Sequence, residues 1–210
     1  MRYESIIWDF DGTLFDTYPG MCRNLKQAMA SIGIQVSEEE LLPRFLVSLR
    51  RAIEFCAERG GMDPDFVFQT YRSWVQEHPL PEAKPYSGAR ELLAAFQAAG
   101  GRNFIFTHRG ESVHAYLAQE TWTAYFTEVV PFGPAFERKP SPSGNLYLME
   151  RHGLDAGKTL AVGDRELDVL AAKAAGAEAC LVSKVEAETA ADYQIRELEE
   201  LYALIGLEKE

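Results

Sequence analysis

The sequence predicts an α/β fold in which a doubly wound, Rossmann-like parallel sheet carries an inserted all-helical domain. Three observations predict it. Short apolar runs alternate with helix-forming stretches along residues 85–210, which is typical of a parallel sheet covered on both faces. Residues 16–84 contain helix-forming stretches but no convincing strand. Polar residues follow the apolar runs, at the strand ends where ligands bind in such sheets.

The elements of the core are predicted from apolar runs and from the Gly and Pro residues that mark the ends of helices. Buried-strand patterns predict strands at 5–8, 103–107, 127–130, 159–163 and 179–182. Stretches rich in helix formers predict helices at 88–99, 111–120, 141–152, 166–175 and 196–205. Gly100-Gly101 and Gly176 stop two of these helices, and Pro142 occupies the first turn of another, where its missing N–H is harmless. Right-handed crossovers then place the carboxyl ends of all strands on one edge.

The inserted segment is predicted to form four helices. They are expected at 18–31, from Ser37 onward, at 49–59 and at 63–77. Ser37 and Glu40 form a capping box, and Pro43 is expected to break that helix early. Proline-bearing stretches flank the insertion on both sides. The predicted domains are therefore a Rossmann-like core of residues 1–15 and 85–210 and an inserted helical domain of residues 16–84.

Composition excludes several classes of protein. The chain has 210 residues, of which 47% are apolar and 25% charged, so it is neither disordered nor of low complexity. No apolar run approaches the ~20 residues that span a membrane, and the first residues lead at once into a strand, which leaves no room for a signal peptide. Three scattered cysteines predict buried thiols in a reducing compartment rather than disulfides. We expect a cytoplasmic protein.

The charge balance restricts the partners. The net charge is −11 and no basic face is evident, so neither nucleic acid nor an anionic membrane is an expected partner. A small phosphorylated metabolite remains compatible if dedicated cations or a metal neutralise it locally. A monomer or weak dimer is expected.

Four aspartates are predicted to meet at the carboxyl edge of the sheet. Asp9 and Asp11 follow the first strand, and Asp164 and Asp168 follow the strand at 159–163. Two like charges ~4 Å apart repel by about 4 kcal/mol at an effective dielectric of ~20, so the cluster needs a cation. An all-oxygen set with few carboxylates suits Mg²⁺, which shares the oxygens of a bound phosphate.

The same edge offers the parts of a phosphoryl-transfer site. Lys139 supplies a compact positive charge for phosphate, and Thr107 supplies a hydroxyl. Asp9 could attack phosphorus to form an aspartyl-phosphate, which divides one difficult displacement into two easier ones. Asp11, two residues on, could protonate the leaving alcohol and then deprotonate the attacking water.

These residues resemble the four motifs of the haloacid dehalogenase superfamily. The motifs are Asp9–Leu14, Thr107, Lys139-Pro140 and Gly163–Asp168. The resemblance implies Asp9 as nucleophile, Asp11 as acid and base, and Thr107, Lys139 and Gly12 as phosphate or substrate contacts. It implies Mg²⁺ bound by Asp9, the Asp11 carbonyl and Asp164, with Asp168 orienting the metal's waters. The helical insertion resembles the cap of the phosphoglycolate-phosphatase-like and β-phosphoglucomutase-like branches. The dehalogenases of this superfamily lack the second aspartate of the first motif, so the presence of Asp11 favours phosphate chemistry over carbon–halogen chemistry.

Substrate contacts are also expected outside these motifs. His108 and Arg109 stand where many relatives have Asn and Lys, and both are candidates to touch the substrate. The alternatives are a His108 bonded to the backbone and an Arg109 exposed to solvent. Ser48, Arg50 and Arg51 lie where the resemblance places the substrate-specificity loop of the cap, and either arginine could meet a second anion on the leaving group.

The function predicted from the sequence is a Mg²⁺-dependent phosphatase of small, soluble phosphate monoesters. A phosphomutase of the same superfamily would share every motif. A phospho-receiver domain fits poorly, because it needs only ~120 residues and carries no helical insertion. A silent, ligand-binding relative is a further alternative. The motifs leave the identity of the ester open.

Overall fold

A six-stranded parallel sheet forms the centre of the computed structural model, which describes residues 1–78 and 80–208. The strand order is β5-β4-β1-β6-β7-β8, and every adjacent pair is parallel. The strands are β1 (Ser5–Trp8), β4 (Arg102–Phe106), β5 (Phe126–Val130), β6 (Thr159–Gly163), β7 (Glu178–Val182) and β8 (Tyr193–Ile195). From β1 the chain adds β4 and β5 on one side, and it then crosses over to add β6, β7 and β8 on the other side of β1. This change of side between β1 and β6 is the doubly wound pattern. The predicted fold class is confirmed.

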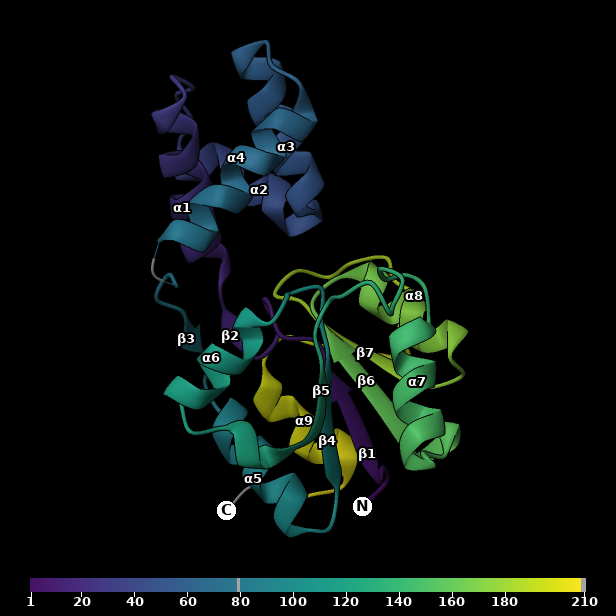
Figure 1. The fold of residues 1–210 in the computed structure, drawn as a ribbon. Helices are drawn as coiled ribbons and strands as arrows, with labels where there is room; N and C mark the ends of the chain where they lie inside the picture. The colour runs from purple at the N-terminus through teal and green to yellow at the C-terminus, as the bar shows by residue number, and fades with distance from the viewer. Residues whose placement is uncertain (79, 209–210) are drawn as a thin grey trace. The chain divides into compact units, whose positions relative to one another are not determined.

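Helices cover both faces of this sheet (Figure 1). The helices α7 and α8 lie on one face, and α5, α6 and α9 lie on the other (Figure 1). Their bounds are α5 (Ala89–Ala98), α6 (Ser112–Gln119), α7 (Ser143–His152), α8 (Glu166–Ala174) and α9 (Leu201–Ile205). Three short 3₁₀ turns connect them, η1 (Thr123–Tyr125), η2 (Ala156–Lys158) and η3 (Leu198–Glu200). Because both faces are covered, all four residues of β1 are buried.

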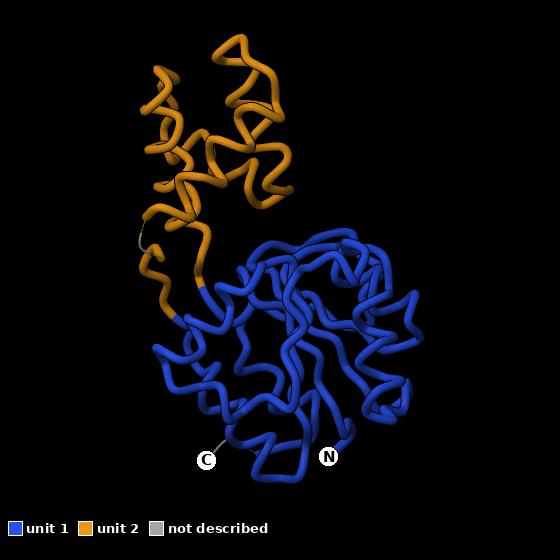
Figure 2. The backbone as a smooth tube through the Cα atoms, in the orientation of Figure 1, with its two compact units in different colours: residues 1–15, 85–210 blue, residues 16–84 orange. Residues whose placement is uncertain are grey.

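The chain divides into two compact units, coloured separately in Figure 2. One comprises residues 1–15 and 85–210, and the other comprises residues 16–84. The second unit contains α1 (Tyr18–Ser31), α2 (Glu38–Val47), α3 (Leu49–Gly60) and α4 (Pro64–Glu77). It has its own apolar core, which includes Leu25, Leu41, Ile53 and Val67. Two-residue strands, β2 (Phe15–Asp16) and β3 (Lys84–Pro85), pair where the chain passes between the units.

The early break predicted at Pro43 is wrong. The capping box of Ser37 and Glu40 does open α2, but the helix continues through Pro43 to Val47. A proline in a helix interior costs about 3 kcal/mol. Leu41 and Phe45, one on each side of it, are 0% and 1% exposed. Burial of such side chains stabilises by about 1.5–3 kcal/mol each, so together they offset the cost of the proline.

The carboxyl-terminal part differs from the predicted helix at 196–205. The structure has the short strand β8, then the 3₁₀ turn η3, and an α-helix only over Leu201–Ile205. Asp192 starts this pairing, because its N–H donates to the Ala179 carbonyl while its carboxylate accepts from the Ala179 N–H. A three-residue edge strand is too short to show alternation, which explains why the sequence pattern did not reveal it.

A buried hydrogen-bond network joins the central strands to the neighbouring helices. The indole Nε1 of Trp8 donates to Asn103 Oδ1 at 3.0 Å. The Asn103 amide donates in turn to the carbonyls of Leu93 and Tyr125. Trp8 and Asn103 are 0% and 1% exposed. These polar groups have no access to bulk water, so each depends on its protein partner.

We predict that Asn103→Leu destabilises the protein although the side chain keeps its approximate volume. The Trp8 indole N–H and two carbonyls would lose their partner inside the core, and each unsatisfied group costs about 1–3 kcal/mol. Urea unfolding should report the loss. Trp8→Phe should cost less in the Asn103→Leu background than in the wild-type protein, since the indole N–H that it removes is already without a partner there. A fully additive second loss would contradict this explanation.

Candidate active site

The carboxyl ends of β1, β4 and β6 bring the predicted site residues together. Asp9 follows β1, Thr107 follows β4, and Asp164 follows β6. The registers align Trp8 with both Ile105 and Val162, so the three strands end at the same level. Backbone bonds continue this alignment, because the N–H of Asp9 donates to the Val162 carbonyl at 2.8 Å. The site thus lies at the switch point of the sheet, where open α/β sheets bind ligands.

Lys139 joins two buried carboxylates from different elements, Asp9 directly after β1 and Asp168 in α8. Its Nζ lies 2.7 Å from Asp9 Oδ1 and 2.8 Å from Asp168 Oδ1. All three side chains are almost fully buried, with 4%, 1% and 6% exposed. Burial alone would lower the pKa of Lys139, but the charges of Asp168 and Asp9 outweigh it and raise that pKa. The ammonium is therefore charged and is held at the nucleophile candidate.

One of the two carboxylate oxygens of Asp9 lacks a hydrogen-bond partner among the described residues. Burial raises the pKa of the Asp9 carboxyl, and the charge of Lys139 acts in the opposite direction. Oδ1 accepts from Lys139, whereas Oδ2 is buried without a hydrogen-bond partner among the described residues. A buried, unsatisfied carboxylate oxygen is rare unless a ligand completes it.

Three carboxylates are close enough to hold a metal ion. Oxygens of Asp9, Asp164 and Asp168 all lie within 4.8 Å of one another. The Asp168 oxygens already accept from Lys139 Nζ and from the Arg165 N–H, whereas Asp9 Oδ2 has no such partner. A hard cation that binds oxygen, such as Mg²⁺, fits this donor set. Asp9 and Asp164 would then bind the metal directly. Asp168, whose oxygens already accept hydrogen bonds, would not be a direct ligand.

Gly163 permits the close approach between the end of β6 and Asp168. A Cβ at position 163 would lie 2.4 Å from Asp168 Cβ, closer than any real carbon contact. Only glycine therefore lets the end of β6 approach the start of α8 and place Asp168 against Lys139.

The chain after Asp9 forms a tight turn. The Phe10 carbonyl accepts from the N–H groups of Leu14 and Phe15 at 3.1 Å each. Gly12 has φ +83°, a left-handed conformation that favours glycine, and its N–H donates to the Phe15 carbonyl at 2.8 Å. The sequence analysis named Gly12 as a substrate contact, and here its conformation reverses the chain beside Asp11.

Asp11 has a different partner from the other three aspartates. Arg109 Nε lies 2.8 Å and Arg109 Nη2 lies 2.6 Å from Asp11 Oδ1. The Asp11 carboxylate does not belong to the group of oxygens described above. The Arg109 side chain is only 11% exposed, so the alternative of an arginine in solvent is wrong.

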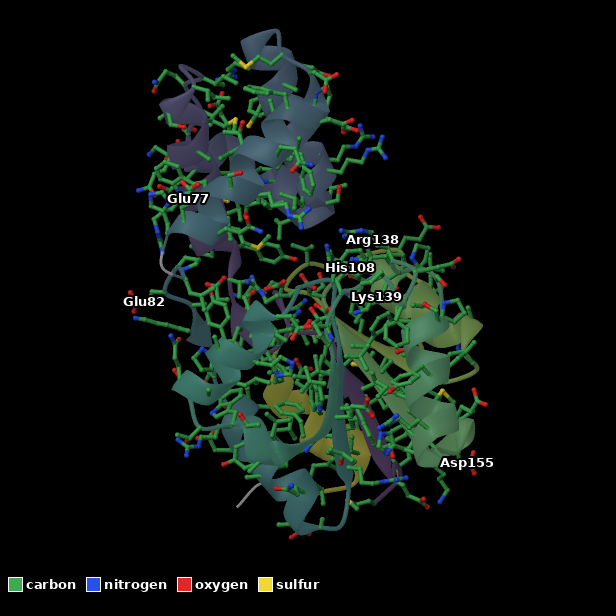
Figure 3. All side chains as sticks on the ribbon, viewed as in Figure 1. Glu77, Glu82, His108, Arg138, Lys139 and Asp155 are labelled. Atoms are coloured by element: carbon green, nitrogen blue, oxygen red, sulfur yellow. The ribbon has the colours of Figure 1, made fainter. Side chains whose placement is uncertain are left out.

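Thr107 and His108 are both built into the site by backbone bonds. Thr107 is 1% exposed and its Oγ1 accepts from the Arg109 N–H at 3.1 Å. His108 Nε2 accepts from the Lys139 N–H at 2.6 Å, and Figure 3 labels both residues at this edge. Burial and the charge of Lys139 lower the pKa of His108 to about 3. The alternative in which His108 binds backbone is therefore the geometry observed.

Arg165 was not singled out in the sequence analysis. Its Nε lies 3.8 Å from Asp164 Oδ1 and 4.0 Å from Asp168 Oδ2, and the side chain is 15% exposed. Its charge adds to that of Lys139 in opposing the pKa rise of Asp9. The only available signal was its place directly after Asp164, which by itself does not distinguish a site residue from a helix start.

The predicted contacts in residues 16–84 have partners within that unit. Ser48 caps α3, and its hydroxyl accepts from the Arg51 N–H at 3.2 Å. Arg50 Nε lies 2.8 Å and Arg51 Nη1 lies 3.2 Å from the Glu54 carboxylate. Arg50 and Arg51 are 87% and 68% exposed. Both guanidinium groups are therefore accessible to an anion.

Comparison with known proteins yields matches along most of the chain. A family model described as haloacid dehalogenase-like hydrolase matches residues 6–182. A phosphoglycolate phosphatase of Pseudomonas syringae pv. syringae (strain B728a) is 30% identical over 81% of this chain and 66% of its own length. The chain thus spans just under two thirds of that relative.

Solved structures also resemble the chain over nearly its full length, and two of them serve as examples. A hydrolase from Streptococcus pneumoniae TIGR4 is 28% identical, with a TM-score of 0.66 and coverage of 99% of this chain and 100% of that one. A protein described as a predicted phosphoglycolate phosphatase from Haemophilus somnus 129pt has a TM-score of 0.85 at 20% identity, covering 97% of this chain and 98% of that one. The latter likeness concerns the fold alone.

The buried His108 predicts a pH dependence of stability. Its folded pKa is about 3, below the unfolded value of about 6.5, so its neutral form is favoured on folding. Its contribution is complete above about pH 6.5 and is lost as the pH falls toward 3, by up to about 1.4 kcal/mol per pH unit.

His108→Gln keeps an acceptor for the Lys139 N–H but does not titrate. The free energy of unfolding of the wild-type protein, measured in urea between pH 7.5 and 4.5, should fall relative to that of the variant as the pH decreases. Parallel pH profiles for the two proteins would contradict the assignment.

Proposed function

The chain belongs to the haloacid dehalogenase-like hydrolase family, and from this premise we propose that it is a magnesium-dependent phosphatase of small phosphate monoesters. The observation that carries the proposal is Asp9, a buried carboxylate with Oδ1 held by Lys139 and Oδ2 without a hydrogen-bond partner among residues 1–78 and 80–208. A carboxylate placed in this way at the end of β1 is suited to attack phosphorus.

The proposed reaction has two displacements. Asp9 attacks phosphorus, and the bond to the leaving oxygen breaks as an aspartyl-phosphate forms. A proton from the Asp11 carboxyl goes to the departing alkoxide. Water then attacks the aspartyl-phosphate and gives its proton to Asp11, which releases inorganic phosphate and restores both carboxyl groups. Asp11 thus ends the cycle in the state in which it began.

Charge neutralisation is the main task of the surrounding residues. Phosphoryl transfer depends mostly on positioning and on compensation of the phosphoryl charge. Lys139 lies between Asp9 and Asp168, where its ammonium can compensate the nucleophile and the phosphoryl oxygens. Thr107 offers its hydroxyl at the neighbouring strand end. A Mg²⁺ held by Asp9, the Asp11 carbonyl and Asp164 would supply further compensation of phosphoryl charge, with Asp168 orienting its waters.

We propose 2-phosphoglycolate as the substrate to test first. Relatives from Pseudomonas syringae and Mesorhizobium japonicum carry the name phosphoglycolate phosphatase. Such a substrate has a carboxylate beyond the ester, and residues 16–84 are the proposed cap that recognises it. The exposed guanidinium groups of Arg50 and Arg51 support this proposal, since a guanidinium binds a carboxylate bidentately.

The direct test is release of inorganic phosphate from 2-phosphoglycolate in the presence of Mg²⁺. Wild-type protein should release it, and excess chelator should abolish release until Mg²⁺ is restored. Asp9→Asn should leave the circular dichroism spectrum unchanged and reduce turnover by at least a thousandfold, because an amide is not a nucleophile toward phosphorus. Full activity in chelator would refute the metal requirement. With a sugar phosphate as substrate, conversion to a positional isomer without release of inorganic phosphate would instead indicate a mutase.

Substrate choice should depend on the cap arginines. We expect Arg50→Ala to lower kcat/KM for 2-phosphoglycolate at least tenfold more than for 4-nitrophenyl phosphate, which carries no carboxylate. Arg51→Ala removes the other arginine that pairs with Glu54, and a larger loss in that variant would assign the recognition to Arg51 instead. Equal losses on the two esters would show that the substitution acts through stability rather than recognition.

A further inference from the structure

The ion pair between Arg109 and Asp11 has no role in the reaction as proposed above. Two of its nitrogens, Nε and Nη2, contact the same carboxylate oxygen, Asp11 Oδ1, at 2.8 and 2.6 Å. The two side chains are 11% and 13% exposed. An ion pair this buried is geometrically restrained, unlike a pair on the surface.

The guanidinium is held from several directions. Its Nη1 donates to Ser112 Oγ at 3.3 Å, and its own backbone N–H donates to Thr107 Oγ1. The guanidinium carbon lies 5.8 Å from the centre of the Phe10 ring and 5.0 Å from that of Tyr116. Hydrogen bonds and aromatic faces together therefore restrict Arg109 to one position.

This pairing has a consequence for the four aspartates. The oxygens of Asp9, Asp164 and Asp168 lie together, and Lys139 binds two of those carboxylates. Asp11, only two residues from Asp9, is bound instead by a cation from the segment after β4. Arg109 thus keeps the side chain of Asp11 apart from the other carboxylates.

We propose that Arg109 is the positioning residue of the proposed acid and base, Asp11, and this inference rests on the function proposed above. Both N–H groups of the guanidinium donate to Asp11 Oδ1, so they fix the orientation of the Asp11 carboxyl group. In the first displacement a proton moves from this carboxyl group to the leaving alkoxide as the P–O bond breaks. In the second, the carboxylate takes a proton from the attacking water as the bond to Asp9 breaks.

Leaving-group dependence provides the test. An alkoxide needs a proton to depart, whereas 4-nitrophenolate leaves readily without one. We expect Arg109→Met to lower kcat for 2-phosphoglycolate at least tenfold more than kcat for 4-nitrophenyl phosphate. Asp11→Asn should show the same asymmetry. The double variant Arg109→Met with Asp11→Asn should have a kcat for 2-phosphoglycolate less than threefold below that of Asp11→Asn alone. Both substitutions disable the same proton transfer, so their effects should not add.

Two further variants keep the test decisive. Arg109→Lys retains the charge and one donor, so it should fold even if Arg109→Met does not, and it should recover part of the alkyl-ester rate. Arg151→Met is the matched control, because Arg151 pairs with Glu128 away from these residues and its loss should leave the ratio of the two rates unchanged. Equal losses of Arg109→Lys on both esters, or additive losses in the double variant, would overturn the inference. Wild-type protein inactive on both esters would instead overturn the proposed function.

Discussion

The contact of one buried ammonium with two buried carboxylates is the constraint on which the rest of the site depends. Removing charged groups from water costs several kcal/mol per ion, and attraction between them compensates only if the geometry is close. Lys139 meets this condition, with 2.7 Å to Asp9 and 2.8 Å to Asp168. The strand order that places β1 beside β6, and the absence of a Cβ at Gly163, both serve this contact. A change in either would leave a buried charge without its partner.

A second ion pair lies close by in sequence but is separate in structure. The turn stabilised by Gly12 directs Asp11 away from Asp9, and Arg109 receives it. Two aspartates from one short loop thus have two different cations and two different environments. Such a separation suits a reaction that needs one carboxylate as an unprotonated nucleophile and another as a proton carrier.

The two units have distinct chemical characters. The unit with the sheet contains the buried charges, the orphaned oxygen of Asp9 and the neutral His108. The unit of residues 16–84 has an apolar core of its own and presents exposed arginines at the start of α3. In a chain with a net charge of −11, these arginines are local cations that an anion could approach. Among the described residues, no helix is long and apolar enough to cross a membrane.

Local sequence patterns determined the strands, the helical insertion and the strand-end positions of Asp9, Thr107 and Asp164. They could do so because burial, capping and turn formation are read from residues near in sequence. The patterns misjudged Pro43 and the short strand β8, where packing of Leu41 and Phe45 and pairing with β7 decided the outcome. Only the tertiary structure decided that Arg109 binds Asp11 and that His108 accepts from the Lys139 N–H. It also decided that Asp9 Oδ2 has no hydrogen-bond partner in the described part of the chain. The Arg109–Asp11 and His108–Lys139 contacts join residues 98 and 31 positions apart, so no local pattern can specify them.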